Sequence, residues 1–283
     1  MLPDRRALLE GLGGLAVGGA VAGLAGNLAL AGTAPVAAVE TRRFTRFSQQ
    51  GGDFSWLPHK LNPDECAPVA YDGFWHNLHA CGYGAFYSIV GMMAEKYGAP
   101  YDQFPFSMLA VNEGGITGWG TICGALYGAA AAFALFWNRE ECSPMVNELF
   151  RWYESAQLPV YDPGSAARAF VGPLPANAPG SVLCHVSVSK WCRDFNKKAN
   201  GNELGERCAR LTVDVSRKAI EILNAKIAQG KAYKSTLPVQ PAVVQCTACH
   251  AAGRESDIQK SKMDCAPCHG GNPHLGNKFR KHP

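Results

Sequence analysis

The chain has 283 residues, enough for one large domain or two modest ones. It is 47% hydrophobic and 18% charged, so it can bury a core and is not a disordered chain. The net charge is only +4, and no basic stripe interleaved with aromatic residues occurs, so we expect no nucleic-acid partner.

The N-terminus has the pattern of an export signal. Arg5 and Arg6 precede residues 11–39, which carry no charge and are rich in Gly and Ala. This pattern predicts a twin-arginine signal peptide over residues 1–39, with a small-residue cleavage site at Ala29-Leu30-Ala31. The alternative is an uncleaved membrane anchor, but the many glycines would make a weak transmembrane helix. We expect cleavage, a periplasmic location and no membrane span in the mature chain.

The next segment, residues 40–237, has the pattern of a helical domain. Residues 40–65 look irregular, and a helix is expected to start after Tyr71. Residues 82–97 then place Phe86, Ile89, Val90 and Met93 at helical spacing, which predicts a helix there.

Further helices are expected along the same domain. Residues 124–137 are uncharged but too few to span a membrane, which predicts a buried helix. Residues 145–156 have the pattern of an amphipathic helix. Three prolines in residues 172–180 predict a loop, and the longest expected helix covers residues 206–229. The predicted fold class is therefore mainly α.

The short polar tail, residues 238–283, carries two copies of a Cys-x-x-Cys-His motif, the attachment site of haem c. The thiols of each copy form thioethers with the haem vinyl groups, and the histidine becomes an axial iron ligand. The predicted attachment residues are Cys246, Cys249, Cys265 and Cys268, with His250 and His269 as proximal ligands. Such a tail cannot bury a core unaided. We therefore expect a small, irregular dihaem domain in which two haems per chain supply the apolar core.

Other interpretations of the tail are weaker. Two Cys pairs separated by residues 250–264 also match a four-Cys zinc site, and one pair alone matches a dithiol redox site. A zinc site with four thiolates does not need the histidine that follows each pair, and the export signal points to the compartment where haem is attached. Each haem also needs a sixth ligand, for which His185 and His274 are the candidates and Met263 a less favoured one.

Seven further cysteines precede the tail, and because the number is odd they cannot all pair as disulfides within the chain. Cys81 and Cys123 open expected helices and Cys208 lies on the first turn of the longest, where N–H groups favour a thiolate. Twin-arginine export carries folded proteins, often with a cofactor already inserted, so we expect an iron–sulfur cluster. Inert buried thiols or some disulfides are the alternative, and Cys66 and Cys142 are left out because their settings look loop-like.

Three of these segments and the tail motifs together resemble a known family. The residues are Cys81–Phe86, 118–130 (with Cys123-Gly124-Ala125) and 183–192 (with Cys184 and Cys192). They are similar to the split-Soret cytochromes c, within a wider group of redox-active proteins defined by spaced cysteines and a glycine-rich turn before Cys-Gly-Ala. The likeness covers roughly residues 55–283.

The resemblance implies more than the spacing can show. It implies a periplasmic homodimer in which a helical Cys-rich domain precedes a small dihaem domain. It also implies haems with two histidine ligands each, some of them borrowed from the partner subunit, and a binuclear [2Fe–2S] cluster. By position, Cys81, Cys123, Cys192 and Cys208 match the family's spaced cysteines, and Cys184 is a fifth candidate.

The function expected from these observations is outer-sphere electron transfer rather than enzymatic catalysis. Histidines are numerous enough to close both haems, and no paired carboxylates or nucleophile–base motif stands out. The alternatives are a haem- or cluster-dependent reductase of a small substrate and a zinc-binding structural protein.

Overall fold

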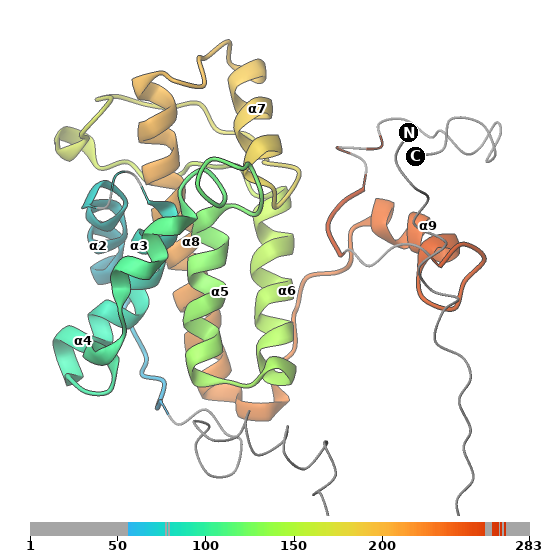
Figure 1. The fold of residues 1–283 in the computed structure, drawn as a ribbon, viewed down its shortest axis with the longest axis horizontal. Coiled ribbons are helices and arrows are strands. Elements are labelled where there is room, and N and C mark those ends of the chain that lie inside the picture. Colours follow the sequence, from blue (N-terminus) through green and yellow to red (C-terminus); the bar gives the residue numbers. More distant parts are fainter. Residues whose placement is uncertain are drawn as a thin grey trace, which may run out of the picture. The chain divides into compact units, whose positions relative to one another are not determined.

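The structure is a computed structural model, and it describes residues 56–76, 78, 80–257, 262–265, 267 and 269. The chain divides into two units, Met1–Ser48 and Gln49–Pro283, and all the described residues belong to the second. The predicted signal peptide therefore lies outside the described residues. Where the structure is described it is helical, without strands, which confirms the mainly α prediction (Figure 1). No helix in this part is long and apolar enough to cross a membrane.

Helix α2 (Pro63–His76) packs against α8 (Asn202–Gln229). The prediction that this first helix starts after Tyr71 was wrong. The Asn62 side chain accepts the Asp64 N–H at 2.9 Å, Pro63 occupies the first turn, and Asp64 and Glu65 lie near the positive end of the helix dipole. The start of α2 is thus set by capping and charge, which apolar spacing does not report.

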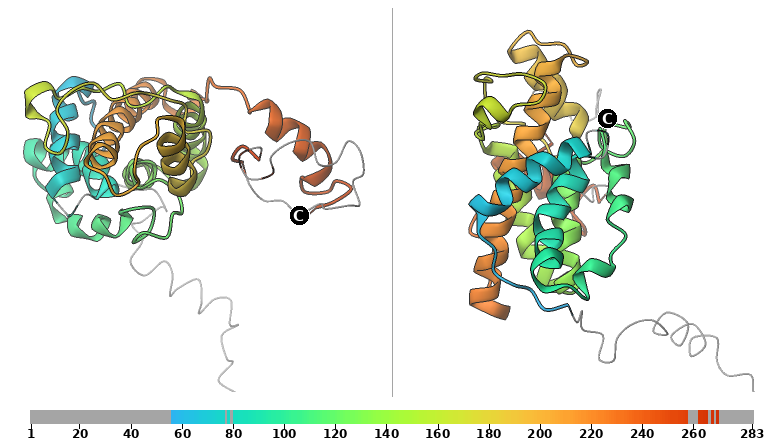
Figure 2. Two further views of the ribbon diagram at one scale, coloured as in Figure 1. Left: turned by 90° about the horizontal axis from the view of Figure 1, so that it is seen from above. Right: turned by 90° about the vertical axis from the view of Figure 1, so that its left-hand side faces the viewer.

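The second helical segment is continuous from Cys81 to Tyr97. It consists of α3 (Cys81–Phe86), a π-helical turn (Tyr87–Gly91) and α4 (Met92–Tyr97), which confirms the helix expected over residues 82–97. The first half packs against α2, α5 and α8 (Figure 2). Its position matters because Cys81 is its first residue.

Helices α5 (Gly124–Phe136) and α6 (Arg139–Ser155) run alongside α8 (Figures 1 and 2). The buried helix expected over residues 124–137 is confirmed by α5. Helix α6 begins before the expected residue 145, because Asn138 caps it by accepting the Glu141 N–H at 3.0 Å.

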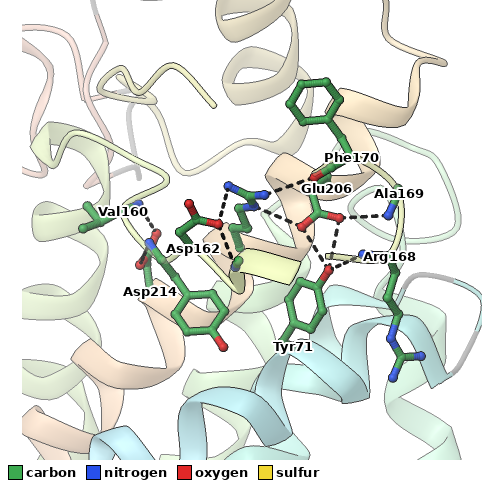
Figure 3. A network of polar contacts seen from close by, with 11 residues as sticks. Tyr71, Val160, Asp162, Arg168, Ala169, Phe170, Glu206 and Asp214 are labelled. Atoms are coloured by element: carbon green, nitrogen blue, oxygen red, sulfur yellow. Dashed lines mark hydrogen bonds and ion pairs between the residues drawn. The ribbon is translucent and has the colours of Figure 1, made fainter. Parts of the chain in front are cut away.

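A long loop joins α6 to α7 (Cys184–Asp194), and it includes the loop predicted at residues 172–180. Two buried carboxylates of α8 hold it in place (Figure 3). Glu206 accepts the Tyr71 hydroxyl at 2.9 Å and the Ala169 N–H at 3.1 Å, and Asp214 accepts the Val160 N–H at 2.7 Å. These contacts fix the approach of the chain to Cys184.

Helix α9 (Pro241–His250) lies in the tail, and Val243 is its buried residue. The tail is attached to α6 by polar contacts. The Glu154 carboxylate accepts the Gln240 side-chain amide at 3.2 Å and the Asp264 N–H at 3.0 Å. The division of the chain at residues 39 and 237 stays a prediction.

Candidate metal centre

Three helices of the described structure begin at a cysteine. Cys81 is the first residue of α3, Cys123 is the N-cap of α5, and Cys184 is the first residue of α7. Cys208 lies in α8, on its second turn rather than the first because α8 begins at Asn202. The free N–H groups of a helix start favour negative charge, so the three starts provide a setting that suits thiolates.

A short antiparallel pairing brings two of these helix starts together. The Cys123 N–H donates to Val182 O at 2.8 Å, and the Cys184 N–H donates to Thr121 O at 2.7 Å. Ile122 and Leu183 form the bridge between them. Cysteines that are 61 positions apart in the sequence thereby become neighbours.

Glycines allow the start of α3 to approach α5 closely. A Cβ atom on Gly124 would lie 2.0 Å from the Asn112 carbonyl oxygen and 3.1 Å from the Cys81 Cβ. One on Gly128 would lie 2.3 Å from the Gly82 carbonyl oxygen. Only glycine fits at such distances, which explains why the Cys81 and Cys123 segments are rich in glycine.

The thiols of Cys81, Cys123, Cys184 and Cys208, which we call the thiol cluster, act on one another electrostatically. Burial raises the pKa of the Cys81 thiol well above its usual value, and Cys208, Cys123 and Cys184 raise it further. Burial is also the largest cause of the raised pKa of Cys184, and Cys123 and Cys208 raise it further. Four such thiols cannot all ionise unless positive charge accompanies them.

Buried polar atoms surround the thiol cluster. The Asn112 side chain is fully buried against Gly82 and Gly124, and its amide oxygen and nitrogen have no hydrogen-bond partner among the described residues. Arg207 is 1% exposed and donates to the Ser187 hydroxyl at 2.9 Å, and the same hydroxyl accepts that of Tyr153 at 3.0 Å. Unpaired polar atoms are costly in a core and call for a structural explanation.

A cavity of about 560 Å³ opens beside the thiol cluster, and Cys81, Cys184 and Cys208 line it. His185 also lines it, as an exposed residue on the first turn of α7, next to Cys184. Cys192 lies eight residues further along α7, which is roughly 12 Å along the axis at 1.5 Å per residue. The structure thus brings together four of the five cysteines proposed from sequence. Cys192 lies two turns away from Cys184, yet it also raises the pKa of the Cys208 thiol.

Cys66 and Cys142 have a different environment. Both lie in helices, α2 and α6, and not in the loop-like settings expected from sequence. Burial raises the pKa of Cys66 to about 12 and that of Cys142 to about 11. The nearest polar contact of Cys142 is the Trp137 carbonyl oxygen at 3.1 Å, so these two thiols resemble small apolar core residues.

In the tail, Cys246, Cys249 and His250 of the first haem motif lie on α9. Cys265 of the second motif lies close enough to Cys246 to interact with it electrostatically. Burial, and after it the nearby Cys246 thiol, raises the pKa of Cys265 to about 11. The His250 Nδ1 lies 3.3 Å from the Ser256 carbonyl oxygen. Cys268 and His274, the remaining attachment cysteine and a candidate distal ligand, lie outside the described residues.

An apolar groove of about 730 Å³ runs beside the second haem motif. Its lining comes from α5, α6 and the turn between them, including Trp137, Val146 and Phe150, and from Met263 of the tail. Met263 precedes Cys265 by two residues, so the groove lies next to a predicted haem-attachment cysteine.

No group of three or more His, Cys, Asp or Glu side chains in the described part of the chain is arranged to hold a metal ion. The effects of the thiols on one another's pKa values nevertheless show that they are neighbours. They therefore lie near one another without forming a closed cage around a single ion.

Comparisons with known proteins indicate the class and the family of the chain. Residues 84–222 match a family model described as "Putative redox-active protein (C_GCAxxG_C_C)". That span contains Cys123, Cys184, Cys192 and Cys208 and begins three residues after Cys81. The class indicated is a helical redox protein with spaced cysteines.

The particular family follows from two longer matches. The chain is 57% identical over 281 residues to the split-Soret cytochrome c of Desulfovibrio desulfuricans, covering 99% of each chain. A solved structure of that cytochrome, described as having a novel iron centre, is similar with a TM-score of 0.77 and 59% identity. It covers 84% of this chain and 100% of its own. The chain belongs to the split-Soret cytochrome c family.

Sequence reasoning missed the residues that surround the thiol cluster. Asn112 and Tyr153 are ordinary polar and aromatic positions in the sequence, and only the fold brings them to the cysteines. Arg207 directly precedes Cys208 and lies in a helix with a strong apolar pattern. A charged residue next to a cysteine at that position was the one signal in the sequence that pointed to this environment.

Proposed function

We propose that this protein is an exported electron carrier that holds two haems c and one [2Fe–2S] cluster per chain. The observation that carries the proposal is the coexistence of two haem-attachment motifs in the tail and four interacting thiols, buried or half-buried, in the helical body. Its relative from D. desulfuricans is named a cytochrome c, and the structure of that relative is described as having an iron centre.

The thiol cluster fits an iron–sulfur group better than a single ion. In a [2Fe–2S] cluster four thiolates are shared between two irons, so the thiols need not close around one point. Hydrogen-bond donors near the sulfurs tune such clusters, and the helix starts and the unpaired Asn112 amide would supply them. We assign Cys81, Cys123, Cys184 and Cys208 as ligands. Cys81, Cys184 and Cys208 line one cavity and Cys123 raises the pKa of all three, whereas Cys192 raises the pKa of Cys208 but does not line that cavity.

The tail fits covalently attached haem. Cys246 and Cys249 are three residues apart on α9, which places both thiols on one side of the helix beside His250. The apolar groove of α5 and α6 next to Cys265 is surface of the kind that a haem covers. We assign His250 and His269 as proximal ligands, and we keep His185 and His274 as the distal candidates.

Bound haem and cluster would supply one-electron chemistry, and the polypeptide would set its conditions. If histidines ligated both faces of each haem, no position would remain for a substrate, and outer-sphere transfer would be the chemistry that the haems supply. Burial of the thiols and the nearby N–H groups would set the charge that the cluster can carry.

A second candidate function comes from the cavity beside the thiol cluster. Because Cys184, His185 and Cys208 line it, a small molecule could reach the metal centre and be reduced there. Oxidation of the reduced protein by peroxide or an oxyanion at a catalytic rate would favour this reductase. Stoichiometric reoxidation alone would favour the carrier.

Export and pairing belong to the same proposal. Twin-arginine export of a folded, cluster-loaded chain followed by haem attachment in the periplasm accounts for both kinds of motif in one sequence. The homodimer, with haem ligands shared between subunits, rests on the family resemblance. Unaffected export of a reporter fused to residues 1–45, in cells without the twin-arginine translocase, would contradict the route.

The haem assignment is tested by removing one attachment thiol from each motif. We expect Cys249→Ser and Cys268→Ser each to reduce covalent haem from two to one per chain, measured by pyridine haemochrome absorbance and by mass. Replacing both should leave none. Full covalent haem in either single variant would exclude that motif as an attachment site, and zinc in place of haem would restore the structural alternative.

A further inference from the structure

The buried arginine of α8 has an unusual electrostatic setting. Arg207 is 1% exposed, and its guanidinium lies over the Trp191 ring, 5.9 Å from the ring centroid. It donates to the Ser187 hydroxyl at 2.9 Å and lies 3.9 Å from the Cys208 sulfur, while its Nε has no partner among the described residues. A guanidinium keeps its charge in proteins, so this is a cation held in the core.

The other two deeply buried cations of the described structure are paired with carboxylates. Arg210 is 2% exposed and contacts Glu206 at 3.0 Å and Asp162 at 3.2 Å. Lys226 is also 2% exposed and contacts Glu141 at 2.9 Å. These pairs show how this fold normally compensates a buried positive charge.

Arg207 has no such partner. No carboxylate of the described residues forms an ion pair with it, since Glu206 binds Arg210 and Asp214 accepts the backbone N–H groups of Val160 and Tyr161. The Cys208 and Cys123 thiols and the Tyr153 hydroxyl act most strongly on its charge, and the Asp214 carboxylate, whose own pKa Arg207 lowers, acts on it without forming an ion pair. A buried charge without an ion-pair partner is costly, so negative charge is expected on the thiols in the working protein.

We propose that Arg207 is the buried counter-charge of an anionic iron–sulfur centre bound by the thiol cluster, and that it sets the reduction potential of that centre. This inference rests on the cluster assignment made under the proposed function. Four thiolates and two bridging sulfides give the centre a net negative charge, and reduction adds one more electron. A fixed positive charge beside Cys208 stabilises the reduced form more than the oxidised form.

The test uses the purified full-length protein and follows the cluster by electron paramagnetic resonance during a redox titration. Arg207→Gln should lower the ratio of reduced to oxidised cluster at a fixed potential at least tenfold, which for a one-electron couple is about 59 mV. Arg207→Lys keeps the charge and should shift the ratio less. Arg193→Gln, which removes a guanidinium that is 74% exposed on α7, should leave it unchanged.

Loss of the cluster from Arg207→Gln but not from Arg207→Lys would also support the proposal, because an uncompensated anionic centre is expelled. Haem absorbance in the same samples reports whether the variants fold. An unchanged potential in a loaded Arg207→Gln variant, or equal effects of Gln and Lys, would overturn the role of Arg207. Wild-type protein without non-haem iron and sulfide would instead overturn the cluster itself, and the role of Arg207 with it.

Discussion

The cysteines of the helical body differ in their neighbours as well as in their burial, since Cys184 and Cys208 are only half-buried. Cys66 and Cys142 are as buried as Cys81, yet each lies alone among core residues. Burial is the largest cause of the raised pKa of Cys81, Cys184 and Cys208, and other thiols of the cluster raise the pKa of each further. At the scale of single residues, the distinction between a structural and a functional cysteine is therefore set by the fold.

This distinction predicts a difference between matched substitutions. We expect Cys208→Ser to lose most of the non-haem iron and sulfide, because a cluster ligand is removed. Cys142→Ser replaces a more deeply buried thiol away from the cluster and should keep both. Iron and acid-labile sulfide analysis, normalised to haem, distinguishes the two variants. Equal retention of iron in both would remove Cys208 from the ligand set.

Local sequence could indicate some of these cysteines but could not rank all of them. Cys81 and Cys123 open apolar helices and follow or precede glycines, so both were identifiable as thiols at helix starts. Cys184 and Cys192 lie in one short segment and look equivalent in sequence. Only the pairing of Leu183 with Ile122 fixes which of them reaches the centre, and that contact is not local.

At the scale of elements, apolar spacing located helices better than it located their first residues. The buried helix at Gly124–Phe136 was predicted almost to its ends because its uncharged run is continuous. The starts of α2 and α6 were missed because Asn62 and Asn138 cap them ahead of the apolar pattern. Helix α7 was not predicted as a helix at all, since its eleven residues mix polar and apolar positions.

The crossing of α3 and α5 depends on glycine, which predicts a change in stability. Gly128→Ala would place a Cβ 2.3 Å from the Gly82 carbonyl oxygen, so the two helices must separate. We expect the free energy of unfolding to fall by about 1–3 kcal/mol, more than the alanine gains in helix propensity. Chemical denaturation measures the change, and cluster content should fall with it because Cys81 and Cys123 lie at this crossing.

The control is a second helical glycine with free space around it. On Gly205 of α8 the new Cβ would lie 3.7 Å from its nearest neighbour, the Trp75 ring. Gly205→Ala should therefore raise the free energy of unfolding by about 0.5–1 kcal/mol through helix propensity alone. If both alanine substitutions changed the free energy of unfolding in the same direction, close packing would not explain why glycine occupies position 128.

At the scale of the whole molecule, the chain combines a helical body that has its own core with a tail that has little. Val243 is the buried residue of α9, while most of α8 is buried. The tail is attached to the body by polar contacts at Glu154 and by Met263, which packs against the core. Haem would add the apolar surface that the tail lacks, and the need for it was evident from composition.

The two cofactor types are the central claim, and metal stoichiometry of the purified mature protein tests it most directly. Haem, total iron, acid-labile sulfide and zinc are measured on the same sample and expressed per chain. We expect two haems, two further irons and two sulfides per chain, with no zinc. Iron equal to haem without sulfide, or zinc in place of iron, would contradict the claim.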